Sequence, residues 1–298
     1  MTQIVAAGNH SYAVVAADRR FTVNGALVDE ADDERNKLML IATRTARLGV
    51  AFCGLGRLGP FETERWLAVL LLETLRAGGG TPDLELLCRR ATDDFAALRA
   101  DVSAQKCVWI VMAGFVSEPD GVTPAYAFVS NAELGRSGLR AGAFRSEVFE
   151  PEGRDQQAYA MSLGAVHVRD ASVDELKTIV TNDNPPEATV GAALRILREA
   201  RRDSSTGDLV GDRCGSVVVW SEKARQPEGR YFGQRGATRQ FMPTLVTSER
   251  VHLNVTLDRP RMVAPRNGPC PCGSGKRFRA CHGARSSGVR GRPRSSDG

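Results

Sequence analysis

The sequence lacks the features that mark a membrane-spanning or secreted chain. Its longest apolar run, residues 66–72, falls far short of the roughly 20 residues that a membrane-spanning helix needs. The first residues carry neither the basic segment nor the apolar segment of a secretory signal. No Gly-rich loop of the G-x-x-x-x-G-K-[ST] type occurs either, which excludes a P-loop nucleotide hydrolase. We therefore expect a cytoplasmic protein without a membrane partner.

Residues 1–258 have no excess of positive charge. The 298-residue chain has 40 Lys and Arg against 35 Asp and Glu, a net charge of +5. Residues 259–298 hold ten of the basic and one of the acidic side chains, which leaves about −4 for residues 1–258 and gives about +9 to the tail. The larger part of the chain is therefore not a basic, nucleic-acid-coating core.

Composition divides the chain into four parts. Residues 1–225 alternate between short apolar runs and amphipathic helical patterns, and residues 226–258 form a polar extension with two strand-like stretches. Residues 259–284 hold a cysteine cluster, and residues 285–298 are basic and almost free of apolar side chains. Because apolar burial must offset the entropy of ordering a chain, we expect this last segment to be disordered.

The first part predicts an α+β fold. Apolar runs predict strands at residues 4–7, 12–17, 36–42, 47–53, 107–116, 125–129 and 217–220. Helical patterns cover residues 60–77 and two later stretches, one that starts at Thr81, as N-cap, and one that starts with the run Pro185–Glu187. Ser172 and Glu175 form the expected capping box of a helix through Val180. Two sheets packed between two helical layers would use every apolar face in this order of elements.

Three of the seven cysteines fall within twelve residues. Cys270, Cys272, Cys281 and His282 have the spacing C-x-C-x8-C-H. Three thiolates and one imidazole complete a tetrahedral zinc shell and leave no open position for water. We therefore expect one structural Zn²⁺ per chain, whose binding supplies the folding energy of a segment with almost no core. The other four cysteines stand in apolar contexts and are predicted to be small buried hydrophobes: Cys53, Cys88, Cys107 and Cys214.

The segment from Arg266 to Gly283 closely resembles the SEC-C motif, a zinc-binding tail of the preprotein translocase motor and of many unrelated bacterial proteins. The resemblance implies zinc binding and docking to a protein or ribosomal partner. Three cations and one aromatic lie between the expected ligands, in the run Lys276–Arg279. They suit an acidic protein surface or RNA phosphates, or alternatively they only balance the negative charge of a zinc ion with three thiolates.

Residues 2–221 carry stretches that resemble the proteasome β-subunit family. They include Val14–Arg20, Asn36–Leu38, Gly49–Leu55 and a later segment that runs from Ala200 to Gly207. Members of that family are N-terminal-nucleophile hydrolases with a four-layer αββα sandwich. The resemblance implies this fold for residues 1–225 and leaves assembly into a homo-oligomer open.

The resemblance also implies catalytic roles. Thr2, 16 residues before Asp18, would become the nucleophile once Met1 is removed, and its own α-amine would accept the hydroxyl proton. Lys37 would lower the pKa of this nucleophile and its amine, and Asp18 would orient Lys37. The backbone N–H of Gly54 would donate to the oxyanion.

Two further residues, Asp203 and Thr206, would support the terminal amine. The sequence departs from the family at several points. About three extra residues separate Asp18 from Lys37, and Thr206 stands where Ser is usual. The family's Gly-Ser-Gly has only the segment Ser162–Gly164 as a counterpart, with leucine in the place of the serine.

The sequence leaves three functions open. The first is an N-terminal-threonine peptidase or amidohydrolase that the zinc tail directs to a protein substrate or docking partner. The second is a non-catalytic proteasome-like scaffold that serves as a zinc-dependent adapter. The third is an RNA or ribosome binder that works through the charge of the tail.

Overall fold

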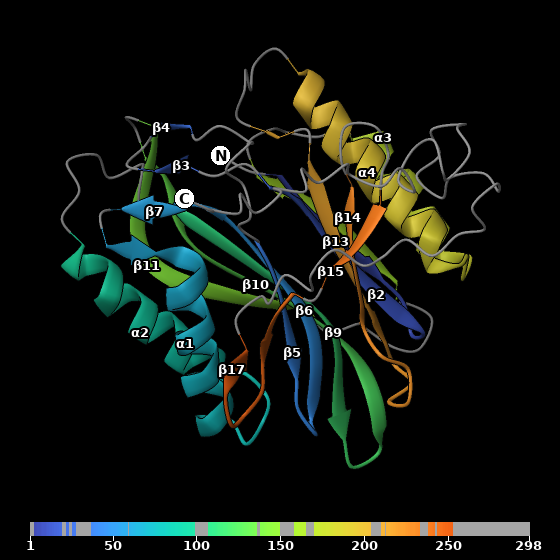
Figure 1. Ribbon diagram of the computed structural model, residues 1–298, viewed down its shortest axis with the longest axis horizontal. Coiled ribbons are helices and arrows are strands. Elements are labelled where there is room, and N and C mark those ends of the chain that lie inside the picture. Colours follow the sequence, from blue (N-terminus) through green and yellow to red (C-terminus); the bar gives the residue numbers. More distant parts are fainter. Residues whose placement is uncertain are drawn as a thin grey trace, which may run out of the picture.

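The computed structural model describes residues 3–19, 22–23, 26–27, 37–58, 60–98, 107–135, 138–149, 158–164, 170–203, 210–211, 213–232, 238–241 and 243–252. These residues form a mixed α+β structure in which two large sheets face each other and two pairs of helices lie on their outer sides (Figure 1). None of the helices in the described part is long and apolar enough to cross a membrane.

The first sheet is built on the N-terminal hairpin. Strand β1 (Gln3–Gly8) pairs antiparallel with β2 (Tyr12–Asp18), as the two apolar runs predict. The sheet has the order β12-β1-β2-β13-β14-β15. The remaining strands are β12 (Tyr159–Gly164), β13 (Cys214–Trp220), β14 (Glu228–Phe232) and β15 (Thr238–Phe241).

The second sheet has the order β11-β10-β9-β6-β5-β16-β17. Its strands are β5 (Leu38–Ala42), β6 (Ala46–Gly54), β9 (Val108–Glu118), β10 (Gly121–Gly135), β11 (Gly138–Phe149), β16 (Thr244–Val246) and β17 (Val251–His252). Strands β14 to β17, which follow residue 225, thus extend both large sheets. A small sheet has the order β4-β3-β7-β8, with β3 (Thr22–Val23), β4 (Ala26–Leu27), β7 (Arg57–Leu58) and β8 (Phe61–Glu62).

One pair of helices covers each large sheet. Helices α1 (Thr63–Ala77) and α2 (Leu84–Ala97) pack on the second sheet, where α2 contacts β11 and α1 contacts β16. Helices α3 (Asp170–Thr181) and α4 (Pro186–Arg202) pack on the first sheet, where they contact β1, β2 and β12. Figure 1 shows the two pairs on opposite sides of the molecule.

Three clusters of buried apolar side chains follow from this arrangement. One lies between the second sheet and helices α1 and α2, and includes Phe52, Leu71 and Phe95. Another lies between the first sheet and helices α3 and α4. The third joins side chains of both sheets, among them Val15 and Val111. Each strand of the hairpin contributes alternate residues to two of these clusters, because successive side chains point to opposite faces of a sheet.

The helix starts differ from the prediction in three places. Helix α1 begins at Thr63, since residues 61 and 62 pair as strand β8. The N-cap of α2 is Asp83 and not Thr81, because the Asp83 carboxylate accepts a hydrogen bond from the backbone N–H of Leu86. The capping box at Ser172 is wrong as well: α3 already begins at Asp170, and the Ser172 hydroxyl donates to Glu199 on α4 (2.9 Å).

Candidate functional site

A buried ion pair joins the two large sheets at one end of the sandwich. Asp18 is the last residue of β2, and Lys37 directly precedes β5. Lys37 Nζ lies 3.4 Å from Asp18 Oδ1, with side-chain exposures of 4% and 0%. The backbone carbonyl of Lys37 accepts a hydrogen bond from the N–H of Phe52, which fixes the start of β5 against β6. The structure thus brings together two residues that the sequence placed in one site.

The first residue of β1 contributes two further contacts to this end. The backbone N–H of Gln3 donates to Asp18 Oδ2 (2.8 Å), so both carboxylate oxygens are engaged. The Gln3 side chain is fully buried, and its amide Nε2 donates to the hydroxyl of Ser162 on β12 (2.7 Å). The residue before Gln3 is Thr2, which lies outside the described residues. Gln3, which contacts Asp18, is therefore the residue next to the predicted nucleophile, Thr2.

Two buried ions are an unfavourable way to hold two sheets together. Moving each ion out of water costs several kcal/mol, and a pair of well-packed apolar side chains is often equal or better for stability. The carboxylate offsets part of this cost through its charge-assisted bond to the Gln3 N–H. Because the pair is not needed for packing, Asp18 and Lys37 are candidate functional residues.

Gly54 ends β6 beside this pair in a conformation that requires glycine. Its φ is +102°, and a Cβ at this position would overlap the carbonyl oxygen of Cys107. The chain that follows is fixed in turn, because the Leu55 N–H donates to the same carbonyl (3.1 Å) and the Thr63 hydroxyl donates to the Leu55 carbonyl. The local backbone at Gly54 is therefore rigidly set. Its predicted role as oxyanion donor stays a prediction.

Cys53 lies next to the ion pair and is not a nucleophile candidate. Burial raises the pKa of its thiol to about 12, although the nearby positive charge of Lys37 acts in the opposite direction. A thiol with such a pKa is protonated at neutral pH, and the thiolate is the reactive form. Cys53, Cys107 and Cys214 are buried, which confirms the expectation for these three, whereas Cys88 is only half-buried.

Asp203 is the C-cap of α4 and is exposed, and its backbone N–H donates to the Glu199 carbonyl (3.2 Å). Its support of a terminal amine stays a prediction. Thr206 and the predicted zinc ligands Cys270, Cys272, Cys281 and His282 lie outside the described residues. Within the described part of the chain, no group of His, Cys, Asp or Glu side chains is arranged to hold a metal ion.

Gln3 and Ser162 are the site residues that sequence reasoning missed. Gln3 is the one polar residue of an otherwise apolar strand. Its position predicts a polar contact, because a buried amide must find a hydrogen-bond partner. Ser162 is separated from it by 159 positions. The segment Ser162–Gly164 does lie beside β1, with Gly164 opposite Gln3 and Leu163 opposite Ile4. The hydroxyl at this end therefore comes from residue 162 and not from residue 163.

Comparisons with known proteins add two findings. The family model of the SEC-C motif matches residues 266–284, which confirms the motif. A search of curated proteins finds no match. Among solved structures, the chain is similar to Anbu (ancestral beta-subunit) from Yersinia bercovieri, at 14% identity over 87% of this chain and 88% of that chain, with a TM-score of 0.42. It is similar at the same identity and coverage to Anbu from Pseudomonas aeruginosa, described as a helical assembly, with a TM-score of 0.41.

At these identities and TM-scores, neither structural likeness bears on function. The strand order and the buried clusters define the fold. The SEC-C match covers the tail only.

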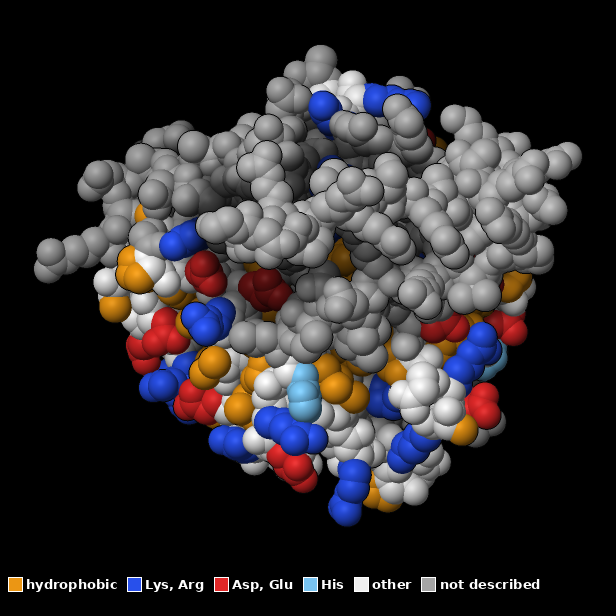
Figure 2. All heavy atoms as spheres, in the orientation of Figure 1, with side chains coloured by type: hydrophobic (Ala, Val, Ile, Leu, Met, Phe, Trp, Pro, Cys, Tyr) orange, Lys and Arg blue, Asp and Glu red, His pale blue; other side chains and the backbone are white. Residues whose placement is uncertain are grey.

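On the face shown in Figure 2, basic and acidic side chains are interspersed over the described surface, with no broad field of one sign. This agrees with the charge balance of residues 1–258.

Proposed function

We propose that the protein is an N-terminal-nucleophile hydrolase of the threonine type, a peptidase or amidohydrolase whose zinc tail directs it to a partner. The observation that carries the proposal is the buried Asp18–Lys37 pair, held by the N–H of Gln3 at one residue from Thr2. The three buried clusters support a four-layer αββα sandwich for the larger part. We propose a cytoplasmic location, because the closely spaced Cys270, Cys272 and Cys281 suit a metal site in a reducing compartment.

In the proposed reaction, removal of Met1 exposes the α-amine of Thr2. The amine takes the proton of the Thr2 hydroxyl as the oxygen attacks the carbonyl carbon of an amide. The backbone N–H of Gly54 stabilises the oxyanion that forms. The intermediate collapses with release of the amine product, which takes up the proton, and water then hydrolyses the ester to regenerate Thr2. The Lys37 ammonium lowers the pKa of the nucleophile, and Asp18 keeps Lys37 charged and in place.

The test combines intact mass with turnover. We expect mature protein to lack Met1 and to hydrolyse a member of a broad panel of peptide and amide substrates. Thr2→Ala should abolish turnover with no change in the unfolding curve, while Thr2→Ser keeps part of it. Retention of Met1, or no turnover across the panel by protein that lacks Met1, would contradict the proposal.

One observation favours a second candidate, a non-catalytic adapter with the same fold. Leu163 occupies the position at which the family has a serine, and it faces the apolar cluster between the sheets. In this case Met1 removal has no functional consequence, and the SEC-C segment is the active part of the protein. A partner that binds equally to wild type and Thr2→Ala, in the absence of any turnover, would favour the adapter.

We further propose that the tail binds one structural Zn²⁺ through Cys270, Cys272, Cys281 and His282. The donor set fits the ion, since three thiolates and an imidazole form a closed tetrahedral shell. We expect about one zinc per chain, lost in Cys272→Ser with little change in the unfolding of residues 1–225. Zinc near zero after purification under reducing conditions would refute this. The docked partner is a protein or the ribosome, and binding that does not weaken with salt would argue against RNA.

A further inference from the structure

Strand β11 is the outermost strand of the second sheet, and its last residues are unusually apolar for an exposed edge. Val148 is 55% exposed and Phe149 is 53% exposed. The strand order ends at β11, so no described strand pairs with its outer edge. Adjacent residues of a strand point to opposite faces, so these two side chains expose apolar surface on both faces of one edge. Natural sheets normally protect edges with charge or proline, and on this edge Arg145 and Glu147 supply the charge beside the two apolar residues.

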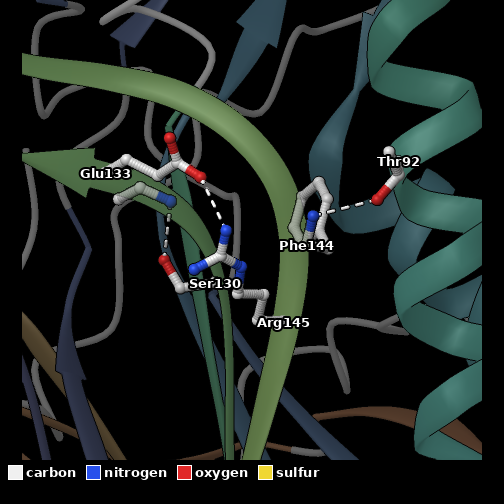
Figure 3. Close-up of polar contacts among 6 residues, drawn as sticks. Thr92, Ser130, Glu133, Phe144 and Arg145 are labelled. Atoms are coloured by element: carbon white, nitrogen blue, oxygen red, sulfur yellow. Dashed lines mark hydrogen bonds and ion pairs between the residues drawn. The ribbon is translucent and has the colours of Figure 1, made fainter. Parts of the chain in front are cut away.

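The other contacts of β11 establish which face each residue occupies. The Phe144 N–H donates to the hydroxyl of Thr92 on α2 (2.9 Å), and Ser146 interacts with Cys88 of the same helix. Arg145 points the other way and bonds Glu133 on β10 (3.3 Å), as Figure 3 shows. Residues 144, 146 and 148 therefore face the helices, and residues 145, 147 and 149 face away from them.

Phe149 packs on a buried pair of tyrosine rings. The ring of Tyr126 lies 5.2 Å from that of Phe149 and 5.3 Å from that of Tyr159 on β12. Tyr126 is 5% exposed, and its hydroxyl has no hydrogen-bond partner among the described residues. The Tyr159 hydroxyl is also buried and has no hydrogen-bond partner among the described residues. Phe149 therefore covers a buried aromatic pair, while its own outer surface is left to solvent.

The charges of the edge are complementary to themselves. Arg145, Ser146 and Glu147 follow one another, and all three are exposed. In an antiparallel pairing of two copies centred on Ser146, Arg145 lies opposite Glu147 of the second copy, and Glu147 lies opposite its Arg145. The same register sets Val148 opposite Phe144 and Phe149 opposite Ala143 of the second copy. Opposite charges that face each other across strands stabilise the pair, and a two-fold axis produces the contact twice.

We propose that residues 143–149 of β11 form an interface with a second copy of this chain, in antiparallel edge-to-edge pairing about a two-fold axis through Ser146. The interface extends the second sheet across both copies and covers Val148 and Phe149. It does not depend on the hydrolase activity proposed above.

The test is a charge-swap series followed by sedimentation equilibrium of the full-length protein. Glu147→Arg places Arg opposite Arg145 of the second copy and leaves the Arg145–Glu133 contact intact. We expect it to weaken self-association at least tenfold. The double variant Arg145→Glu with Glu147→Arg restores opposite charges across the axis and should return self-association to within about threefold of wild type. Such a recovery is not expected if the single variant only damages the fold.

Two apolar variants complete the series. Phe149→Glu should abolish self-association, whereas Val122→Glu, at a 41% exposed residue at the start of β10 and outside the segment that pairs with β11, should leave it unchanged. Matching thermal unfolding curves show that each variant is folded. Wild type that stays monomeric at millimolar concentration overturns the proposal. So does a double variant that is as weak as Glu147→Arg alone, or an equal loss in Val122→Glu.

Discussion

The β1–β2 hairpin buries polar groups at both of its ends, and the two ends differ in charge. At the turn, Asn9 is 3% exposed. Its carbonyl oxygen accepts from the N–H groups of Ser11 (2.9 Å) and Tyr12 (3.1 Å), and its amide donates to the Val180 carbonyl (3.0 Å). The Tyr12 hydroxyl bonds the Asn184 carbonyl (2.7 Å). The Asn9 amide also donates to the exposed carboxylate of Asp183 (3.0 Å), so the buried groups at this end are neutral while one of their partners is an ion at the surface. These bonds close a turn and tie the hairpin to α3 and the loop that follows it.

At the opposite end the polar groups are ions. Asp18 and Lys37 lie 3.4 Å apart with almost no exposure, and Gln3 fixes the carboxylate from the side of the N-terminus. At the turn end the buried groups are neutral and the carboxylate among their partners, Asp183, is exposed, so their desolvation cost is lower. At the other end both ions are buried, at a higher desolvation cost. The chemical role proposed above for Asp18 and Lys37 would account for this difference.

The largest expected effect comes from removing one ion. Asp18→Ala leaves the Lys37 ammonium buried without its carboxylate and leaves the Gln3 N–H without its acceptor. We expect a loss of about 3–5 kcal/mol in the free energy of unfolding, measured by urea titration at neutral pH.

The matched control removes both charges. Asp18→Asn combined with Lys37→Met keeps similar volumes and leaves no unpaired ion, so it should recover most of the lost stability. It should still abolish any turnover. A double variant that is as unstable as Asp18→Ala would mean that the ion pair holds the fold, as the turn end does, and the contrast between the two ends would fail.

Much of the fold follows from local pattern. Apolar runs located β1, β2, β5, β6, β9 and β13, and period-3.6 spacing located the buried face of α2, because both periodicities are set by backbone geometry. Strand β11 was missed, since its polar and small residues give no apolar run and its edge position leaves most side chains exposed. Helix starts were less certain, because Thr81 and Asp83 both carry oxygens that can cap a helix.

The site was predictable only in part. The pairing of Asp18 with Lys37 came from family resemblance, and the structure confirms that they meet. The Gln3–Ser162 bond depends on the register between β1 and β12, strands more than 150 residues apart, and no local pattern sets such a register. The Glu199 partner of Ser172 was missed for the same reason, as it depends on how α3 packs on α4.

A smaller effect is expected at the turn end. Asn9→Ala removes the acceptor of two N–H groups and leaves the buried Val180 carbonyl without this donor. Buried groups without partners cost about 1–3 kcal/mol each, part of which water recovers near the surface, so we expect a loss of about 2 kcal/mol by urea unfolding. Electrophile labelling of Thr2, read by intact mass, should be unchanged. A change in labelling would mean that the turn end also acts on the site.

The smallest effect is expected from the Tyr12 hydroxyl, and it depends on pH. Tyr12→Phe removes the bond to the Asn184 carbonyl and the contact with Thr189, for a loss of about 1 kcal/mol at neutral pH. Burial raises the pKa of Tyr12 in the folded protein, whereas in the unfolded chain the phenol titrates near pH 10.

The sign of the pH effect follows from this difference. The stability contributed by the neutral hydroxyl is present below about pH 10 and is lost as the pH rises towards the raised folded pKa, since only the unfolded chain releases its proton easily. The stability gap between wild type and Tyr12→Phe should therefore narrow above about pH 10. Urea unfolding at neutral pH and above about pH 10 measures it. A gap that stays constant would mean that water reaches the hydroxyl, and that the turn end is less well buried than the ion-pair end.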